Sequence, residues 1–289
     1  MKILNRAISR RQFAALVGGI VSTPVFSRAA ENAGRKLDFQ IGDGFGGAGA
    51  ADISAVIRSA ADSIWRHCPD TRWEVPGFFV YRDKRYPITL DDHRDDGRIA
   101  IWLDTQDTYW AQYAFQFAHE FCHALAGHSN DWHKPAILGK RPNHWLEESF
   151  CETASLFALR AMGKSWETKP PYPNWKSYAG SLTDYAAERL AAAAKDLPDE
   201  KNFVAWFREN EASMRENPTI RPKNSVVAMK LLPLFEATPS GWEAITFFNL
   251  GKIDPEISLA GKLADWKSVA PESQKKFIAE IGAVFDVKI

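Results

Sequence analysis

Two long helical patterns in the middle of this chain constrain its fold more than any other feature of the sequence. Apolar residues recur with helical spacing from about residue 109 to 126, and Gly127 ends that pattern. A second pattern runs from about residue 144 to 162 and is closed by Gly163. The chain has 289 residues, of which 45% are hydrophobic, so it can bury both helices in a sizeable core.

The remaining segments divide into strand-like and helical patterns. A helix is predicted from about 51 to 65, and three strands rich in aromatic and β-branched residues follow at 77–81, 86–90 and 98–103. Beyond a proline-rich stretch at 169–173 only helical patterns occur, at about 181–196, 199–213, 224–236, 240–250, 255–266 and 272–285. The order predicts an α+β fold. We expect a small sheet-containing N-terminal lobe (38–135) and an all-helical C-terminal lobe (136–289), with the two central helices at their junction.

The first central helix carries His119, Glu120 and His123, which spell His-Glu-x-x-His. Side chains at i and i+4 project from one helix face about one turn apart, so both imidazoles can reach one metal ion. Glu120 follows the first histidine and can approach a metal-bound water without binding the metal itself. This pattern predicts a Zn²⁺ site in which Glu120 acts as the general base.

A zinc site of this kind needs a third protein ligand. The segment from Trp145 to Cys151, Trp-Leu-Glu-Glu-Ser-Phe-Cys, resembles the third-ligand helix of gluzincin metallopeptidases, in particular Trp-Leu-Asn-Glu-Gly-Phe-Ala of the aminopeptidase N family. The resemblance places the third zinc ligand at Glu148. It also places Glu152 where thermolysin-like members keep a carboxylate that orients a zinc-binding histidine. It implies a zinc metallopeptidase that hydrolyses a peptide or protein substrate.

Glu147 and Glu148 compete for the ligand position. Neighbouring residues on a helix differ by about 100° of rotation, so the two carboxylates cannot both face the same ion. Glu148 has Glu152 one turn later on the same face, whereas Glu147 has Cys151, a poorer hydrogen-bond partner for an imidazole. The register therefore favours Glu148.

Other residues around the proposed site are less defined. Tyr178 and Tyr185 are candidates for stabilising an oxyanion, although ordinary packing is the alternative for each. His128 and His133 compete as third ligands but stand off the register of other zinc-binding patterns. The strand at 98–103 is expected to pair with an extended peptide substrate, by analogy with the gluzincins.

Two other functions remain compatible with the motif. The chain could be a non-catalytic binding protein stabilised by zinc, or a zinc amidohydrolase with a non-peptide substrate. Structural zinc sites usually close all four positions with Cys and His, and such a site has no need of Glu120. We therefore favour a hydrolase.

The N-terminus has the features of an export signal. Arg10 and Arg11 lie in a twin-arginine pattern, which a short apolar run up to Phe26 and small residues near residue 30 follow. Residues 1–30 are therefore predicted to be a removable twin-arginine signal peptide, which makes the export machinery a partner and the periplasm or the exterior the destination. The apolar run is too short to be a stable membrane anchor.

Charge and cysteine content narrow the function further. The whole chain has 36 basic and 36 acidic side chains, and five of the basic ones lie in the first thirty residues, so the processed chain would carry an excess of about five acids. That balance argues against a nucleic-acid partner held by charge. Three cysteines, Cys68, Cys122 and Cys151, cannot all pair within one chain. A Cys122–Cys151 disulfide is possible if the two helices touch, but buried free thiols are favoured.

Overall fold

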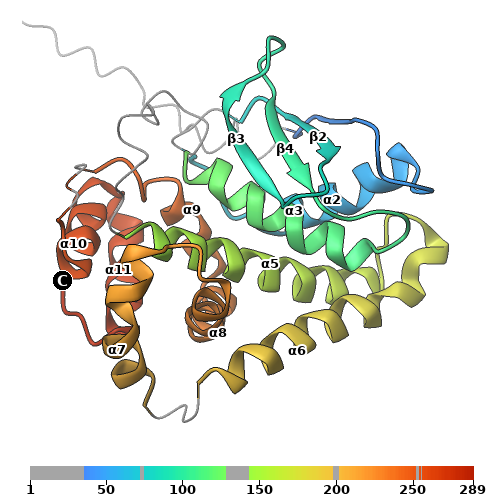
Figure 1. Ribbon diagram of the computed structural model, residues 1–289. Coiled ribbons are helices and arrows are strands. Elements are labelled where there is room, and N and C mark those ends of the chain that lie inside the picture. Colours follow the sequence, from blue (N-terminus) through green and yellow to red (C-terminus); the bar gives the residue numbers. More distant parts are fainter. Residues whose placement is uncertain (1–35, 72–74, 128–142, 198–201, 252–253, 255) are drawn as a thin grey trace, which may run out of the picture.

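The computed structural model describes residues 36–71, 75–127, 143–197, 202–251, 254 and 256–289. The predicted signal peptide and the competing ligands His128 and His133 lie outside these residues. The fold is α+β, as predicted, with a small sheet on one side of a predominantly helical body (Figure 1).

The sheet has four short strands. In chain order they are β1 (Phe39–Ile41), β2 (Phe78–Arg82), β3 (Ile88–His93) and β4 (Ile99–Leu103). Their spatial order is β1-β2-β4-β3, in which β1, β2 and β4 are parallel and β3 runs antiparallel to β4. β4 is therefore an inner strand and β3 lies at an edge. Both sides of β4 are hydrogen-bonded within the sheet, so the expectation that residues 98–103 pair with a peptide is wrong.

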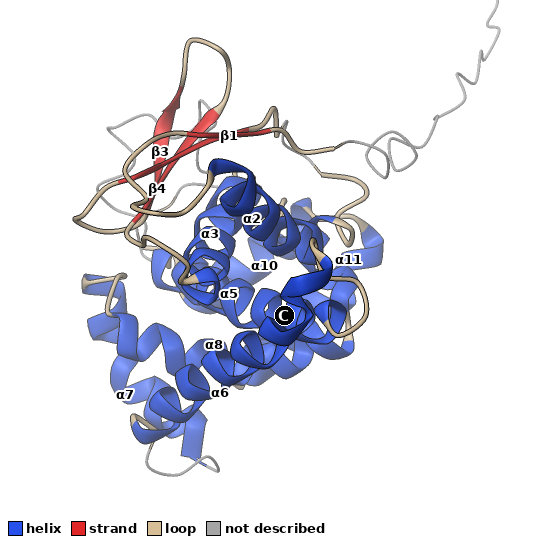
Figure 2. Ribbon diagram, turned by 90° about the vertical axis from the view of Figure 1, so that its right-hand side faces the viewer, coloured by secondary structure: helices blue, strands red, loops and turns tan. Residues whose placement is uncertain are grey.

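Three helices form the layers beneath the sheet. They are α2 (Ala50–Trp65), α3 (Trp110–Leu125) and α5 (His144–Trp166), and α5 lies on the far side of α3 from the sheet (Figures 1 and 2). Phe117 and Phe121 on α3 stack on each other at 5.9 Å and meet Phe78 of β2 edge to face at 5.6 Å. These large rings bury extensive apolar area, so they fix α3 against the sheet.

After α5 the described residues contain helices and turns but no strand, as predicted. The elements are η2 (Pro173–Tyr178), α6 (Ala179–Lys195), α7 (Phe203–Glu216), α8 (Arg221–Ala237), η4 (Pro239–Gly241), α9 (Trp242–Ile245), α10 (Leu259–Val269) and α11 (Glu272–Val284). The continuous helix expected at 240–250 is wrong, because only η4 and the four-residue α9 form there. Trp242 is fully buried and stacks on Phe235 at 4.1 Å, so the apolar residues of this stretch pack into the core without one continuous helix.

Gly163 does not end the second central helix, which continues to Trp166. A Cβ at this position would lie 2.4 Å from Thr183 Oγ1 and 3.2 Å from the Ala179 carbonyl oxygen of α6. The glycine therefore permits close packing of α6 on α5 and is not a helix stop.

Buried side chains from Leu37 to Phe285 form one continuous hydrophobic core. Cys68, Cys122 and Cys151 are all free and buried within it, so the prediction of buried thiols is confirmed. Within the described residues, no helix combines the length and the apolar character needed to cross a membrane.

Candidate metal centre

Buried polar side chains gather where α3 and α5 face each other. On α3, Glu120 and His123 are only 4% and 6% exposed, and on α5 Glu147 and Glu152 are similarly buried. Polar groups removed from water are costly unless they find partners, so such a concentration in a core indicates a mutually satisfied cluster.

Serine and threonine side chains allow α3 and α5 to approach closely. The Ser155 hydroxyl donates to the Phe115 carbonyl oxygen across the interface at 2.7 Å. Ser149 and Thr153 donate to carbonyl oxygens of their own helix, each at 2.7 Å. These hydroxyls are therefore satisfied by backbone carbonyl oxygens, and the Ser155 bond ties α5 directly to α3.

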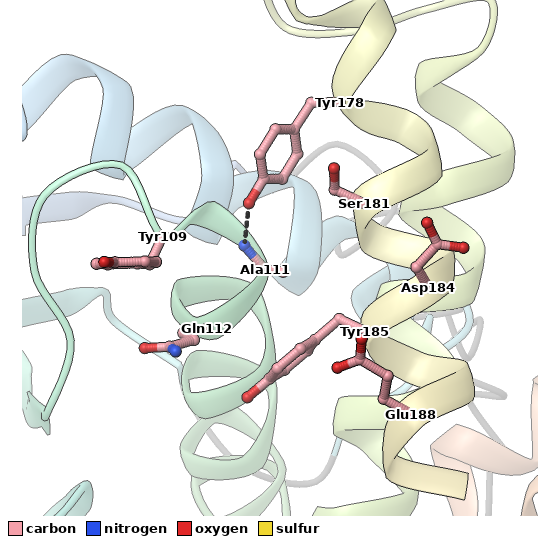
Figure 3. Close-up of a pocket in the computed structure, with 8 residues that line it drawn as sticks. All are labelled: Tyr109, Ala111, Gln112, Tyr178, Ser181, Asp184, Tyr185 and Glu188. Carbon is pink, nitrogen blue, oxygen red and sulfur yellow. Dashed lines mark hydrogen bonds between the residues drawn. The ribbon is translucent and has the colours of Figure 1, made fainter. Parts of the chain in front are cut away.

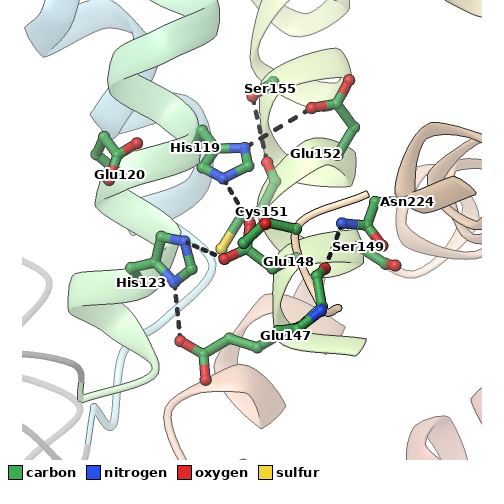
Figure 4. Close-up of polar contacts among 12 residues, drawn as sticks. His119, Glu120, His123, Glu147, Glu148, Ser149, Cys151, Glu152, Ser155 and Asn224 are labelled. Carbon is green, nitrogen blue, oxygen red and sulfur yellow. Dashed lines mark hydrogen bonds and ion pairs between the residues drawn. The ribbon is translucent and has the colours of Figure 1, made fainter. Parts of the chain in front are cut away.

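Glu148 of α5 faces the two histidines of α3. Its Oε2 lies 3.3 Å from His119 Nε2, and its Oε1 lies 3.7 Å from His123 Nε2 (Figure 4). The imidazole rings are 5.2 Å apart between centroids and inclined at 64°. The structure therefore places Glu148, and not Glu147, beside both Nε2 atoms, as its predicted role of third ligand requires.

A second carboxylate lies behind each histidine. Glu152 Oε2 is 3.7 Å from His119 Nδ1, and Glu147 Oε1 is 2.8 Å from His123 Nδ1 (Figure 4). The structure thus brings Glu152 to the histidine, as the resemblance implied. The contact between Glu147 and His123 was not predicted.

These rear carboxylates are themselves held in place. The Ser225 hydroxyl of α8 donates to Glu152 Oε1 at 3.1 Å, and Asn249 Nδ2 donates to Glu147 Oε2 at 2.8 Å. A carboxylate on the Nδ1 side, hydrogen-bonded at His123 and 3.7 Å away at His119, favours the imidazole tautomer whose Nε2 carries a free lone pair. Both histidines are therefore arranged to present Nε2 toward Glu148.

The distance from Glu148 to each histidine is compatible with a tetrahedral ion. Zinc binds histidine nitrogen and carboxylate oxygen at about 2.0 to 2.2 Å, which separates two tetrahedral ligands by about 3.4 Å. The distances from Glu148 to the two histidines, 3.3 and 3.7 Å, lie near that value. The 2.8 Å distance from Glu147 to His123 is that of a hydrogen bond.

Among the described residues, two sets of single donor atoms lie within 4.8 Å of one another, namely Cys151 with His119 and His123, and His144 and Glu147 with His123. Neither set includes Glu148. We prefer Glu148 to Cys151, because a thiol must ionise to bind metal and burial raises the pKa of Cys151 well above its ordinary value. Glu147 is excluded from the preferred set because its carboxylate faces the Nδ1 side of His123.

In the absence of a metal, the histidines and the carboxylates of the cluster stabilise each other's charged forms. Burial alone would lower the pKa of His119, but hydrogen bonds to Glu148 and Glu152 raise it to about 10. Burial likewise acts to lower the pKa of His123, and the charge of Glu148 and the bond to Glu147 raise it to about 9. Burial would raise the pKa of Glu148, but both histidines lower it to about 2. A metal must therefore displace protons from the histidines.

The cluster opens into a cavity of about 440 Å³. Residues 86–89, on the approach to edge strand β3 and at its start, form one wall, and Thr219, Arg221 and Asn224 form another. Glu120 lines the same cavity, and the Thr89 hydroxyl lies 3.0 Å from its Oε2 and 2.9 Å from its carbonyl oxygen. The general base predicted from the motif thus lies beside the proposed ligands.

Tyr178 and Tyr185 lie elsewhere. They line a separate cavity of about 290 Å³ near the start of α3 (Figure 3). Tyr178 Oη accepts the N–H of Ala111 at 3.2 Å, and the Tyr185 ring packs edge to face on Phe115 at 5.8 Å. Because Ala111 precedes His119 by eight residues, about 12 Å of helix separates this cavity from the histidines. The structure does not bring the tyrosines together with the histidines.

Several residues at the site were missed from sequence. His144 Nε2 lies 3.5 Å from Glu148 Oε1, and the i, i+4 spacing of these two residues is a signal that could have identified it. Ser225, Asn249 and Arg221 come from distant helices and turns, and no local pattern in the sequence indicates them.

The donor set defines a class of site, two histidines and one carboxylate beside a second carboxylate that can act as a base. Compared with known proteins, the chain matches no family model, no curated protein and no solved structure. The functional argument therefore rests on the residues and geometry of this chain.

Proposed function

We propose that this protein is a zinc-dependent metallohydrolase of gluzincin type that acts as a peptidase. His119, His123 and Glu148 would hold the ion. The observation that carries the proposal is the two-sided arrangement of each histidine, with Nε2 toward Glu148 and Nδ1 toward a buried carboxylate. A purely structural cluster has no need of the adjacent cavity or of Glu120 within it.

Zinc, when bound, supplies a water of lowered pKa and a positive charge that polarises a carbonyl group. Glu120 accepts the proton of the attacking water and returns it to the leaving nitrogen. Thr89 donates to Glu120 and so fixes the orientation of its carboxylate. Glu147 and Glu152 keep both histidines in the tautomer that binds metal.

The substrate in this proposal is an extended peptide paired with the edge of β3. Among the described strands, none pairs with the outer side of β3, and Ile88 and Thr89 at its start line the cavity. Strand addition satisfies the backbone groups of both chains. The sheet-containing lobe (38–135) and the helical lobe (136–289) would then form the two walls of a zincin-type cleft.

Replacing Glu120 tests the proposal. Glu120→Gln should retain about one zinc per chain, because the ligands are unchanged, and should lose hydrolysis of a diverse peptide mixture by about 10² to 10⁴-fold or more. Glu188→Gln, which removes an exposed carboxylate outside this cavity, is the matched control and should keep full turnover. Zinc content and peptide products are measured for all three proteins. Undiminished hydrolysis by Glu120→Gln would reject the mechanism.

One observation favours the alternative of a zinc-stabilised binding protein. Cys151 lies near both histidines, and a sulfur ligand would help to close the site. In that case zinc loss should unfold the protein while no peptide is cleaved, and Cys151→Ser should weaken zinc binding. Cleavage of small amides without cleavage of peptides would instead indicate an amidohydrolase with a non-peptide substrate.

We also propose that the chain reaches the periplasm or the exterior by the twin-arginine route. Replacing Arg10 and Arg11 by Lys should leave precursor in the cytoplasm, because the export machinery reads the arginine pair as an address. Fractionation of cells that express each form measures the outcome. Normal processing of the double variant would exclude this route.

A further inference from the structure

An arginine side chain stands in the wall of the cavity beside the proposed metal ligands. Arg221 is the first residue of α8 and is exposed, and it has no ion pair or hydrogen bond within the described residues. We propose that Arg221, together with Asn224, binds a carboxylate-bearing residue of the substrate next to the bond that is cleaved. The proposal rests on the proposed peptidase function and names its substrate class.

The charges that line the cavity make this cation significant. Glu120, Glu148 and Glu152 all border the space, and Arg221 is the one permanently charged cation among the described residues that line it. When Glu148 binds the ion, Glu120 and Glu152 still border the space, so an anionic substrate group away from the ion is best received by a cation in the wall. A guanidinium matches a carboxylate with two parallel hydrogen bonds, which fixes the position as well as the charge of the group.

Asn224 supplies an independent observation one helical turn later. Its side chain is 4% exposed, and its Nδ2 donates to the Pro218 carbonyl oxygen at 2.8 Å, which fixes the orientation of the amide. Its Oδ1 is buried and has no hydrogen-bond partner within the described residues, although the residue lines the cavity. A buried acceptor of this kind calls for a donor. The wall therefore offers a cationic donor at Arg221 and an acceptor at Asn224.

A peptide residue with a free carboxylate presents the complementary pair. Its carboxylate accepts from Arg221, and its backbone N–H donates to Asn224 Oδ1. The carboxylate can come from two sources, the C-terminus of the peptide or the side chain of Asp or Glu. Cleavage of the last residue follows from the first source, and cleavage beside acidic residues follows from the second.

Binding measurements on Glu120→Gln separate this inference from catalysis, because that variant keeps the metal ligands. Four peptides of one sequence are compared: a free or amidated C-terminus, combined with Glu or Gln after the scissile bond. We expect about 10 to 100-fold tighter binding when the relevant carboxylate is present, the strength of a charged hydrogen-bonded pair. Adding Arg221→Ala should reduce that ratio to about one, and Arg221→Lys should restore part of it.

Lys223→Ala is the matched control. Lys223 is a cation on the same turn of α8, but it does not line the cavity and donates to Ser213 Oγ. This change should leave the carboxylate preference intact, and a thermal melt of each variant checks that it folds.

Two results would overturn the inference. One is equal binding of all four peptides by the parent protein. The other is that Arg221→Ala weakens the binding of neutral, amidated peptides as much as that of acidic ones. Arg221 would then act on the reacting carbonyl group or on the fold. If the carboxylate preference depends on Arg221 but the wild-type protein cleaves none of the peptides, the carboxylate site stands, whereas the peptidase proposal and the position of that site beside a cleaved bond fail.

Discussion

Zinc binding should release an unusually large number of protons from this protein. In the metal-free protein the neighbouring carboxylates raise the pKa of His119 to about 10 and that of His123 to about 9. At pH 7.5 both imidazoles are then almost fully protonated, and each must lose a proton to bind zinc. Two ordinary histidines, with a pKa near 6.5, would release only about 0.2 protons together at this pH.

Calorimetric titration of the metal-free protein with zinc, in buffers of different ionisation enthalpy, counts these protons. Ionisation of a water molecule adds at most one, so we expect two to three protons per zinc, against about 0.2 to 1.2 for ordinary histidines. The apparent affinity should rise about 100-fold per pH unit between pH 6.5 and 8, because two protons compete with the metal. Glu152→Gln should lower the pKa of His119 by removing a neighbouring carboxylate, so the proton that His119 releases should disappear from the count at a lower pH than in the wild type. A release below about 1.2 protons would refute the ion-paired cluster.

The remaining predictions concern the carboxylates of α5, the glycine of α5 that contacts α6, and a glycine of α6 that contacts nothing. Glu148→Ala should abolish tight zinc binding, whereas Glu152→Ala and Glu147→Ala should each weaken it about 10 to 100-fold as supporting contacts are lost. Competition with a chelator measures the zinc affinity of each variant. An unchanged affinity in Glu147→Ala would contradict the role given to its contact with His123. Glu147→Gln should lose less, because an amide oxygen can still accept from the imidazole. Gly163→Ala should destabilise the fold by about 1 to 3 kcal/mol through the close contact with α6, whereas Gly180→Ala, which meets nothing within 4 Å, should stabilise α6 by up to about 1 kcal/mol. Urea unfolding compares the two, and equal effects would show that packing is not the cause.

The sequence predicted those parts of the fold that depend on local spacing. Periodicity located α3 and α5, and the i, i+4 rule located Glu148 and Glu152 relative to one another. It failed where a partner from elsewhere decides. From the sequence, Gly163 was predicted to end a helix. In the structure it lies inside α5 and allows α6 to pack closely against that helix.

The same limit applies to the site. The contact between Glu147 and His123 depends on how α5 is rotated against α3. The sequence alone does not specify that rotation, because Glu147 and Glu148 are neighbouring carboxylates. Tyr178 was considered from its distance along the chain after the third ligand, but η2 and α6 carry it to the opposite end of α3 from His123. Arg221 became recognisable only when α8 was placed beside the cavity.

The continuous core has a consequence for how the protein should respond to removal of the proposed zinc ion. The helices that carry the proposed ligands lie inside the same hydrophobic cluster that runs from Leu37 to Phe285. These helices should therefore unfold together with the rest of that core and not as a separate unit. Binding free energy at the metal is then shared by the whole described fold, so a chelator should lower the temperature of one cooperative transition instead of creating a second, earlier one.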